Sequence, residues 1–199
     1  MTRFGAVILA AGESKRMGYP KALLQWEDQS FLEKIIATLQ AARIDEIHVV
    51  VSAEGAALLR QHLRLPRVRL VINPDPSRGQ FSSLQQGLLD LETDVALICL
   101  VDHPKVSTSL VFELKEACIA TDALVIIPRF EGRRGHPIAI KRDLIPILLE
   151  APPAGSTKEI LRKYWDRVRE LDTRDAGILA DIDTVLDYEE LLGEKFPHR

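Results

Sequence analysis

The stretch FGAVILAAGESKRMGYPK, residues 4–21, joins a short apolar run to a basic loop that contains glycine. Such a continuous apolar run is typical of a strand buried on both faces of a parallel sheet. Small residues let the backbone of the loop approach a ligand closely, and its N–H groups can bind phosphate oxygens. Lys15, Arg16 and Lys21 add positive charge, although Lys21 does not follow Gly18 directly, as a Walker A loop would require.

The rest of the chain alternates apolar runs with amphipathic segments. Ser30 and Glu33 have capping-box spacing ahead of a helical pattern. Further strands are expected at residues 47–51, 68–72, 95–101 and 123–127, and further helices at 82–91, 107–119 and 156–164. This alternation predicts a single α/β domain over residues 1–199 with a mostly parallel sheet, in which ligands bind beyond the carboxyl ends of the strands.

Composition narrows the class of protein. The 199 residues are 46% hydrophobic and carry a formal net charge of −3, which excludes wholesale disorder and a global basic bias for nucleic acid. The two cysteines, Cys99 and Cys118, lie in apolar stretches and are expected to be buried thiols. No apolar stretch approaches the roughly 20 residues that span a bilayer, and no secretion signal is visible. We therefore expect a cytoplasmic protein with no membrane or nucleic-acid partner.

The loop at residues 9–21, LAAGESKRMGYPK, resembles the LAAGxSxRMGxxK motif of the MobA-like nucleotidyltransferases. This family includes the molybdenum cofactor cytidylyltransferases and guanylyltransferases. The resemblance implies a Rossmann-like three-layer sandwich of the nucleotide-diphospho-sugar transferase type. It also implies that Arg16 and Lys21 hold the triphosphate, with Lys15 as a helper. The backbone at Leu9, Ala10, Ala11 and Gly12 would then frame the nucleotide.

Residues 78–88, RGQFSSLQQGL, resemble the second family segment, in which a glycine loop and a helix headed by serine meet the base and ribose. By this resemblance Gly79, Ser82 and Ser83 are nucleotide-binding residues, with Ser83 the best candidate for contact with the base. Ala11 stands where the guanylyl branch usually has glycine, which favours CTP over GTP. A difference of one methyl group gives only moderate discrimination.

Two acidic segments resemble the family's metal-binding positions. Asp102 in Val-Asp-His-Pro matches the Asp of an Asp-x-Pro motif, and residues 181–187 resemble a DxDTxxD ending. The resemblance implies that Asp102 and Asp181 hold Mg²⁺, with Asp183 as the alternative second ligand. His103 is expected to be a polar neighbour of the site, and Asp102 a catalytic residue beside Arg16 and Lys21.

A third segment, Gly132 to Pro137, resembles the Gly-His-Pro turn of the cytidylyltransferase branch, which shapes the pocket for the second substrate. Acceptor binding is therefore expected from Arg133, Arg134, Gly135, His136 and Pro137. One region departs from the cytidylyltransferase pattern: residues 154–160 read AGSTKEI in place of a Gly-Asp-x-Gly-Ala-Arg-like stretch.

The resemblance implies transfer of a nucleotide from CTP or GTP to a phosphorylated acceptor, molybdopterin in this family, with release of pyrophosphate. A labile product of this kind would be handed to an apo-molybdoenzyme. Two alternatives stay open. The acceptor can be a sugar 1-phosphate or a small phosphorylated alcohol, which the departure at residues 154–160 allows. The chain can also be an accessory protein that binds a nucleotide or cofactor without catalysis, although binding alone does not require a full metal site.

Overall fold

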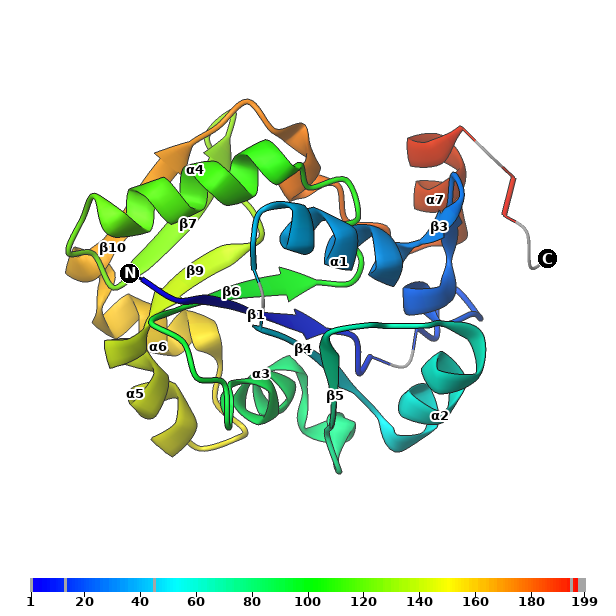
Figure 1. Ribbon diagram of the computed structural model, residues 1–199, viewed down its shortest axis with the longest axis horizontal. Helices are drawn as coiled ribbons and strands as arrows, with labels where there is room; N and C mark the ends of the chain where they lie inside the picture. The colour runs from blue at the N-terminus through cyan, green and yellow to red at the C-terminus, as the bar shows by residue number, and fades with distance from the viewer. Residues whose placement is uncertain (1, 13, 45, 194, 197–199) are drawn as a thin grey trace.

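Eight strands form the main sheet of the computed structural model, which describes residues 2–12, 14–44, 46–193 and 195–196. The strand order is β10-β7-β9-β6-β1-β4-β5, with β8 paired to β7 and a separate β2-β3 hairpin (Figure 1). The strands are β1 (Phe4–Leu9), β2 (Gln25–Trp26), β3 (Gln29–Ser30), β4 (Glu46–Val51), β5 (Val68–Ile72), β6 (Val95–Leu100), β7 (Val125–Phe130), β8 (Arg133–Arg134), β9 (Ile138–Lys141) and β10 (Val168–Asp172).

Helices cover both faces of this sheet. The α-helices are α1 (Phe31–Ala41), α2 (Ala53–His62), α3 (Gln80–Leu88), α4 (Thr108–Ile119), α5 (Ile145–Glu150), α6 (Thr157–Lys163) and α7 (Val185–Leu192). The short 3₁₀ helices are η1 (Lys21–Leu23), η2 (Pro76–Arg78), η3 (Arg142–Leu144), η4 (Trp165–Arg167) and η5 (Ala176–Leu179). A membrane span would need a longer and more apolar helix than any that the described residues form.

The expected α/β sandwich with a mostly parallel sheet is confirmed. β1 runs parallel to both β4 and β6, and β10 runs parallel to β7. Two strands depart from this arrangement: β9 lies antiparallel between β6 and β7, and the short β8 pairs antiparallel with β7. All five strands expected from the apolar runs form, although the run at 123–127 becomes a strand that starts and ends later, at Val125–Phe130.

Strand side chains alternate between two hydrophobic layers, as the two-residue period of a strand requires. Ala6 and Ile8 of β1 pack with α1 and α4 on one face, and Val7 and Leu9 pack with α3, α5 and α6 on the other. Figure 1 shows these two sets of helices on opposite sides of the sheet. Burying each large aliphatic side chain contributes roughly 1.5–3 kcal/mol, so the central strands carry much of the stability.

The helix caps follow the sequence in most places. Ser30 forms the expected capping box with Glu33, and Ser107 and Ser156 cap α4 and α6. The helix expected at 82–91 was placed too late, since α3 begins at Gln80 and ends at Leu88. Gly79, at φ +92° in the region that favours glycine, ends η2 and caps α3 instead of a serine. Ser82 therefore lies within α3, where its hydroxyl donates to the Gly79 carbonyl at 2.8 Å.

A third hydrophobic cluster packs the C-terminal helix, α7, against the basic loop after β1 and the start of α1. Met17 and Phe31 pack with Ile182 and Tyr188, all of them at least 97% buried. The Tyr188 hydroxyl donates to the Gln25 carbonyl at 2.7 Å. This cluster brings the residues just before α7 next to the basic loop after β1, across most of the length of the chain.

The two thiols are buried, as expected from their apolar surroundings. Burial raises the pKa of Cys99 to about 12. Burial also raises the pKa of Cys118 to about 11, against a lowering effect of Lys141. Both side chains therefore remain protonated at neutral pH and act as core packing groups.

The close approach of α3 to the sheet depends on Gly87. An ideal Cβ on Gly87 would lie 2.3 Å from Val7 Cγ1 and 2.7 Å from Val50 Cγ2. In an exposed helix, Gly→Ala stabilises by roughly 0.5–1 kcal/mol, but the clash with two strands reverses the sign here. We expect Gly87→Ala to lower the free energy of unfolding by about 1–3 kcal/mol in urea denaturation.

Gly12→Ala is the matched control, because no heavy atom lies within 4 Å of its ideal Cβ. This variant should unfold within about 0.5 kcal/mol of the unchanged protein. A Gly87→Ala protein as stable as the Gly12→Ala protein would contradict the packing of α3 described above.

Candidate functional site

A cavity of about 650 Å³ lies at the carboxyl ends of β1, β4 and β6. Its lining includes the backbone segment from Leu9 to Gly12, the side chains of Lys15, Arg16 and Lys21, and the carboxylates of Asp102 and Asp183. Parallel strands direct their carboxyl ends to one edge of the sheet, and that is where ligands bind in such folds. The structure therefore brings together most of the residues that the sequence singled out for the nucleotide.

The basic loop is folded back on itself rather than extended into solvent. Ser14, at φ 50°, accepts backbone hydrogen bonds from Met17 at 2.9 Å and Gly18 at 3.1 Å, and its hydroxyl accepts from the Lys21 N–H at 3.2 Å. Met17 is buried in the third cluster and anchors the loop. Gly12 leaves open space where a Cβ would be, so a ligand can approach its backbone. Glu13 lies outside the described residues.

Lys21 is the electrostatic centre of the cavity. Its ammonium donates to Asp102 Oδ2 at 3.0 Å and also donates to Asp183 Oδ1. Its side chain is only 12% exposed, so this pairing is weakly screened by solvent. Arg16 completes the group, since its Nη2 donates to Asp183 Oδ2 at 2.7 Å from a largely exposed position. Two cations and two carboxylates thus form one balanced cluster.

Asp102 is held ionised by its surroundings. Burial would raise its pKa, but a hydrogen bond from His103 and the charge and hydrogen bond of Lys21 outweigh burial and lower it to about 2. His103 Nδ1 lies 2.9 Å from Asp102 Oδ1, while Lys21 contacts the other oxygen. His103 is therefore a polar neighbour of the acidic residue, which agrees with the expectation from the sequence.

The second carboxylate in the cavity is Asp183. The Ile182 N–H donates to the Asp102 carbonyl at 3.0 Å, and the Ile182 side chain is fully buried. This backbone link leaves the following residue, Asp183, facing Lys21. Asp181, which the sequence motif favoured as the metal ligand, is exposed and does not line the cavity.

A buried amide positions the serines of α3. Asn73 Nδ2 donates to Ser82 Oγ at 3.1 Å and to Ser83 Oγ at 3.0 Å. Because Asn73 donates, the Ser83 hydroxyl keeps its own proton for an acceptor. Ser83 and Gly79 line the cavity, whereas Ser82 does not and its hydroxyl is used within the helix. Asn73 was not singled out from the sequence, although it directly follows an expected strand.

The first turn of α2 also lines this cavity and was missed from the sequence. Ser52 caps the helix by accepting from the Gly55 N–H at 3.0 Å, and Glu54 lies between them. These residues follow β4 directly. The strand-end rule that selected the other loops would have found them.

The residues expected to bind the acceptor separate into three groups. Arg134, Gly135 and His136 line a second cavity of about 810 Å³, which shares four lining residues with the first: Leu9, Gly79, Gln80 and Leu100. Pro137 instead lines a small apolar cavity beside His103, and Arg133 is exposed and lines neither. Gly135 is required by packing, because a Cβ there would lie 2.2 Å from the Ile178 carbonyl oxygen.

Three carboxylates line the first cavity: Glu54 on α2, and Asp102 and Asp183, which lie together at Lys21. No group of three or more His, Cys, Asp or Glu side chains within the described ranges is arranged to hold a metal ion. Asp102 and Asp183 already share one cation, the Lys21 ammonium. Two carboxylates next to an open cavity fit a divalent ion that takes its remaining ligands from water and substrate phosphates.

Comparison with known sequences identifies related proteins. A family model described as the MobA-like NTP transferase domain matches residues 6–168. The chain is similar to the nicotine blue oxidoreductase of Paenarthrobacter nicotinovorans, with 32% identity covering 94% of this chain and 95% of that protein. It is 24% identical to the molybdenum cofactor cytidylyltransferase of Escherichia coli K12, with the same coverage. A probable molybdenum cofactor guanylyltransferase of Methanosarcina mazei is 26% identical over 94% of this chain and 89% of that protein.

Solved structures of the same fold cover nearly the whole chain. The crystal structure of Rv0371c from Mycobacterium tuberculosis H37Rv has a TM-score of 0.82 at 26% identity, covering 97% of this chain and 98% of that one. A structure of Rv0371C in complex with manganese has a TM-score of 0.77 at 24% identity, covering 97% and 99%. The arrangement of strands and helices is therefore shared along nearly the whole length of the aligned chains.

The partly buried His136 makes stability sensitive to acid. Burial and the nearby His103 lower its pKa, Asp102 opposes them, and together these effects bring the pKa from 6.5 to about 4. Between these two pH values the unfolded chain binds a proton that the folded chain does not bind. The stability contributed by neutral His136 is therefore present above pH 6.5 and is lost as the pH falls towards 4.

Lowering the pH from 7 to 4.5 should reduce the free energy of unfolding of the metal-free protein. We expect this reduction to be about 2–3 kcal/mol smaller in His136→Gln than in the unchanged protein. Urea denaturation at the two pH values measures this difference. His62→Gln removes an exposed histidine from α2 and is the matched control. An equal loss of stability in the His136→Gln and unchanged proteins would disprove the role of His136.

Proposed function

Because this chain belongs to the family of MobA-like NTP transferase domains, we propose that it transfers a nucleotide from CTP to a phosphorylated acceptor of the molybdopterin type. The observation that carries the proposal is the cluster of Lys21, Arg16, Asp102 and Asp183 at the edge of the sheet. Binding a nucleotide by itself does not require paired carboxylates facing cations. A reaction at a triphosphate does, since charge shifts between phosphate groups as bonds change.

The proposed reaction joins two phosphates. An oxygen of the acceptor phosphate attacks the α-phosphorus of the nucleotide and forms a new P–O bond. The bond from the α-phosphorus to the bridging oxygen breaks, and that oxygen leaves with the β- and γ-phosphates as pyrophosphate. A phosphate is already ionised near neutral pH, so no general base is required. The protein contributes orientation and charge stabilisation.

The loop after β1 is proposed to hold the triphosphate. Gly12 and its neighbours offer backbone N–H groups with room for phosphate oxygens, and Arg16 can bind a phosphate through two N–H groups. Lys21 supplies a point charge at the centre of the site, and Lys15 lines the same cavity. Leu9, Ala10 and Ala11, together with Ser83 and Gly79 on the opposite wall, would frame the base and ribose.

Asp102 and Asp183 are the residues proposed to hold a divalent cation, Mg²⁺ in this proposal. Their oxygens are the hard donors that such an ion prefers, and the pKa of about 2 keeps Asp102 ionised at neutral pH. When bound, the cation would neutralise charge on the phosphate oxygens. His103 occupies one oxygen of Asp102 and so leaves the other directed towards Lys21 and the cavity.

The acceptor is proposed to occupy the second cavity, which meets the first at the wall they share. Relatives named as a molybdenum cofactor cytidylyltransferase and a probable molybdenum cofactor guanylyltransferase support a molybdopterin-type acceptor. Delivery of the product to an apo-molybdoenzyme is part of the proposal. The relative named as an oxidoreductase introduces a second candidate activity on this fold. The decisive assay measures pyrophosphate release with CTP, GTP or UTP and a panel of acceptor phosphates. Oxidation of reduced nicotinamide and flavin nucleotides is followed in parallel.

Release of pyrophosphate only with CTP and molybdopterin would support the full proposal. Release with a sugar 1-phosphate would retain nucleotidyl transfer and replace the acceptor. Nucleotide binding without release across the panel would overturn transfer in favour of an accessory binding protein.

Substitution of the carboxylates distinguishes their roles. We expect Asp102→Asn and Asp183→Asn each to reduce turnover by roughly 10²–10³-fold or more, because each removes charge from the reacting centre. Asp181→Asn, two residues from Asp183 but outside the cavity, should retain turnover within about threefold. Circular dichroism confirms folding of each variant. Near-normal turnover of Asp102→Asn would refute its assignment, and a loss in Asp181→Asn as large as in Asp183→Asn would refute the choice between them.

Choice of base is tested at Ala11, which is buried at the wall of the first cavity. Removing one methyl group in Ala11→Gly gives a purine more room. We expect the ratio of kcat/KM for GTP over CTP to rise by no more than about 10-fold, the usual effect of one methyl group. Steady-state pyrophosphate assays with both nucleotides measure the ratio. A ratio that stays constant or falls would remove Ala11 from the specificity determinants.

A further inference from the structure

The floor of the second cavity is apolar, which restricts what can bind there. The cavity measures about 810 Å³ and lies against one face of the sheet. Aliphatic and aromatic side chains from the sheet and α3 form its floor: Phe81, Leu84, Ile98, Ile127, Ile138 and Ile140. The hydroxyl groups of a sugar would lose their hydrogen bonds to water on such a floor without gaining replacements. A flat ring system loses little and fits the floor better.

An aromatic ring stands at the rim of the same cavity. Trp165 in η4 lines the cavity and is 44% exposed, which is high for so large an apolar residue. The guanidinium of Arg134 lies over this ring, 4.6 Å from its centroid. Arg134 in turn donates to Glu170, which also accepts from Arg129 Nη1 at 2.8 Å. The ring is thus held by a chain of ion pairs to the edge of the sheet.

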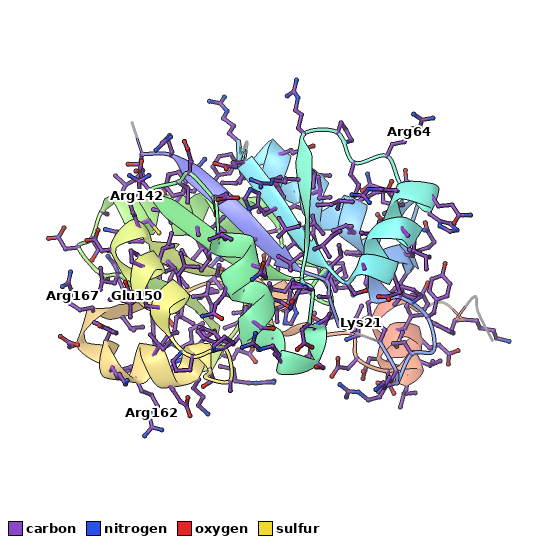
Figure 2. All side chains as sticks on the ribbon, turned by 90° about the horizontal axis from the view of Figure 1, so that it is seen from below. Lys21, Arg64, Arg142, Glu150, Arg162 and Arg167 are labelled. Carbon is purple, nitrogen blue, oxygen red and sulfur yellow. The ribbon has the colours of Figure 1, made fainter. Side chains whose placement is uncertain are left out.

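The charges around the rim are positive. Arg78, Lys158 and Arg162 line the cavity and make no ion pair with any residue in the described part of the chain. Figure 2 shows the labelled Arg162 side chain extending from α6 into solvent. No Asp or Glu is among the described residues that line this cavity. An apolar floor under a rim of unpaired cations favours a ligand that is both apolar in its body and anionic.

Part of the rim comes from residues 154–160, the segment that departs from the cytidylyltransferase pattern. Ser156, Thr157 and Lys158 belong both to that segment and to the rim. The departure from that pattern therefore lies at the rim of the cavity.

We propose that the second cavity binds a flat heteroaromatic anion and that Trp165 is its stacking platform, which makes Trp165 the specificity-determining residue for the acceptor. That this ligand is the acceptor rests on the proposed nucleotidyl transfer, whereas the binding site itself does not. The ring stacks against Trp165 above the apolar floor, and its anionic group meets the cations of the rim.

The chain contains two tryptophans, which provide a matched pair of fluorescence reporters. Trp26→Phe leaves Trp165 as the single tryptophan. Trp165→Leu leaves Trp26, which lines neither large cavity. The probes are pterin-6-carboxylate, a flat bicyclic anion, and glucose 1-phosphate. We expect pterin-6-carboxylate to quench Trp165 saturably in the first variant and to leave Trp26 fluorescence without saturable change in the second. Glucose 1-phosphate should have no effect on either.

Calorimetry on the unchanged protein gives the matching affinities. Trp165→Leu should bind pterin-6-carboxylate about 5–100-fold more weakly, the range of one lost stacking contact, and Trp165→Phe should recover most of the affinity. Equal affinity in the Trp165→Leu and unchanged proteins would overturn the proposal, as would absence of quenching in Trp26→Phe. Stronger binding of glucose 1-phosphate than of pterin-6-carboxylate to the unchanged protein would also overturn the proposal.

Failure of this inference differs from failure of the proposed function. Saturable quenching without release of pyrophosphate from the nucleotide in the presence of any acceptor keeps the ring site and rejects transfer. Transfer to an acceptor with a KM that is unchanged in Trp165→Leu keeps transfer and rejects Trp165 as its specificity residue.

Discussion

The ammonium of Lys21, shared between Asp102 and Asp183, joins three segments that are far apart in the sequence. The segments are the loop after β1, the end of β6 and the residues before α7. Two of these segments are held in place by separate contacts. Met17 anchors the loop, and the Ile182 N–H links the last segment to the backbone of Asp102. A charge cluster of this kind costs desolvation, so it persists only where backbone hydrogen bonds and apolar packing already hold the partners close. The third hydrophobic cluster supplies that packing.

Much of the fold could be predicted because its determinants are local. The strands at the sheet centre are buried on both faces and stand out as continuous apolar runs, and the capping box at Ser30 involves only neighbouring residues. The start of α3 was mispredicted because two serines look like caps, whereas the backbone conformation at Gly79 decides the boundary. α2 was missed because only Ala56 and Leu59 are buried along it, which leaves a weak apolar pattern.

The candidate site was likewise predictable only where its determinants are local. Asp102 directly follows an expected strand and Lys21 ends the loop after another, so their meeting at one edge of the sheet could be anticipated from the parallel arrangement. The position of Asp183 relative to Asp181 depends on the burial of Ile182 and on one backbone hydrogen bond across the chain. No local pattern contains that information. Trp165 lay outside every motif, and only the packing of η4 beside β8 and β10 placed it at a cavity with Arg134.

The floor of the second cavity is at the same time part of the protein's core. Ile98, Ile127 and Ile140 belong to the hydrophobic layer that packs with α3, α5 and α6, and they also line the cavity. A change at these positions alters folding stability and ligand shape together, so selection cannot adjust one without the other. The rim is free of this constraint, since Lys158 and Arg162 are exposed and belong to no core cluster. Substitutions at the rim would therefore change which ligand binds while the floor stays the same. Related proteins with different activities could in this way retain the same sheet.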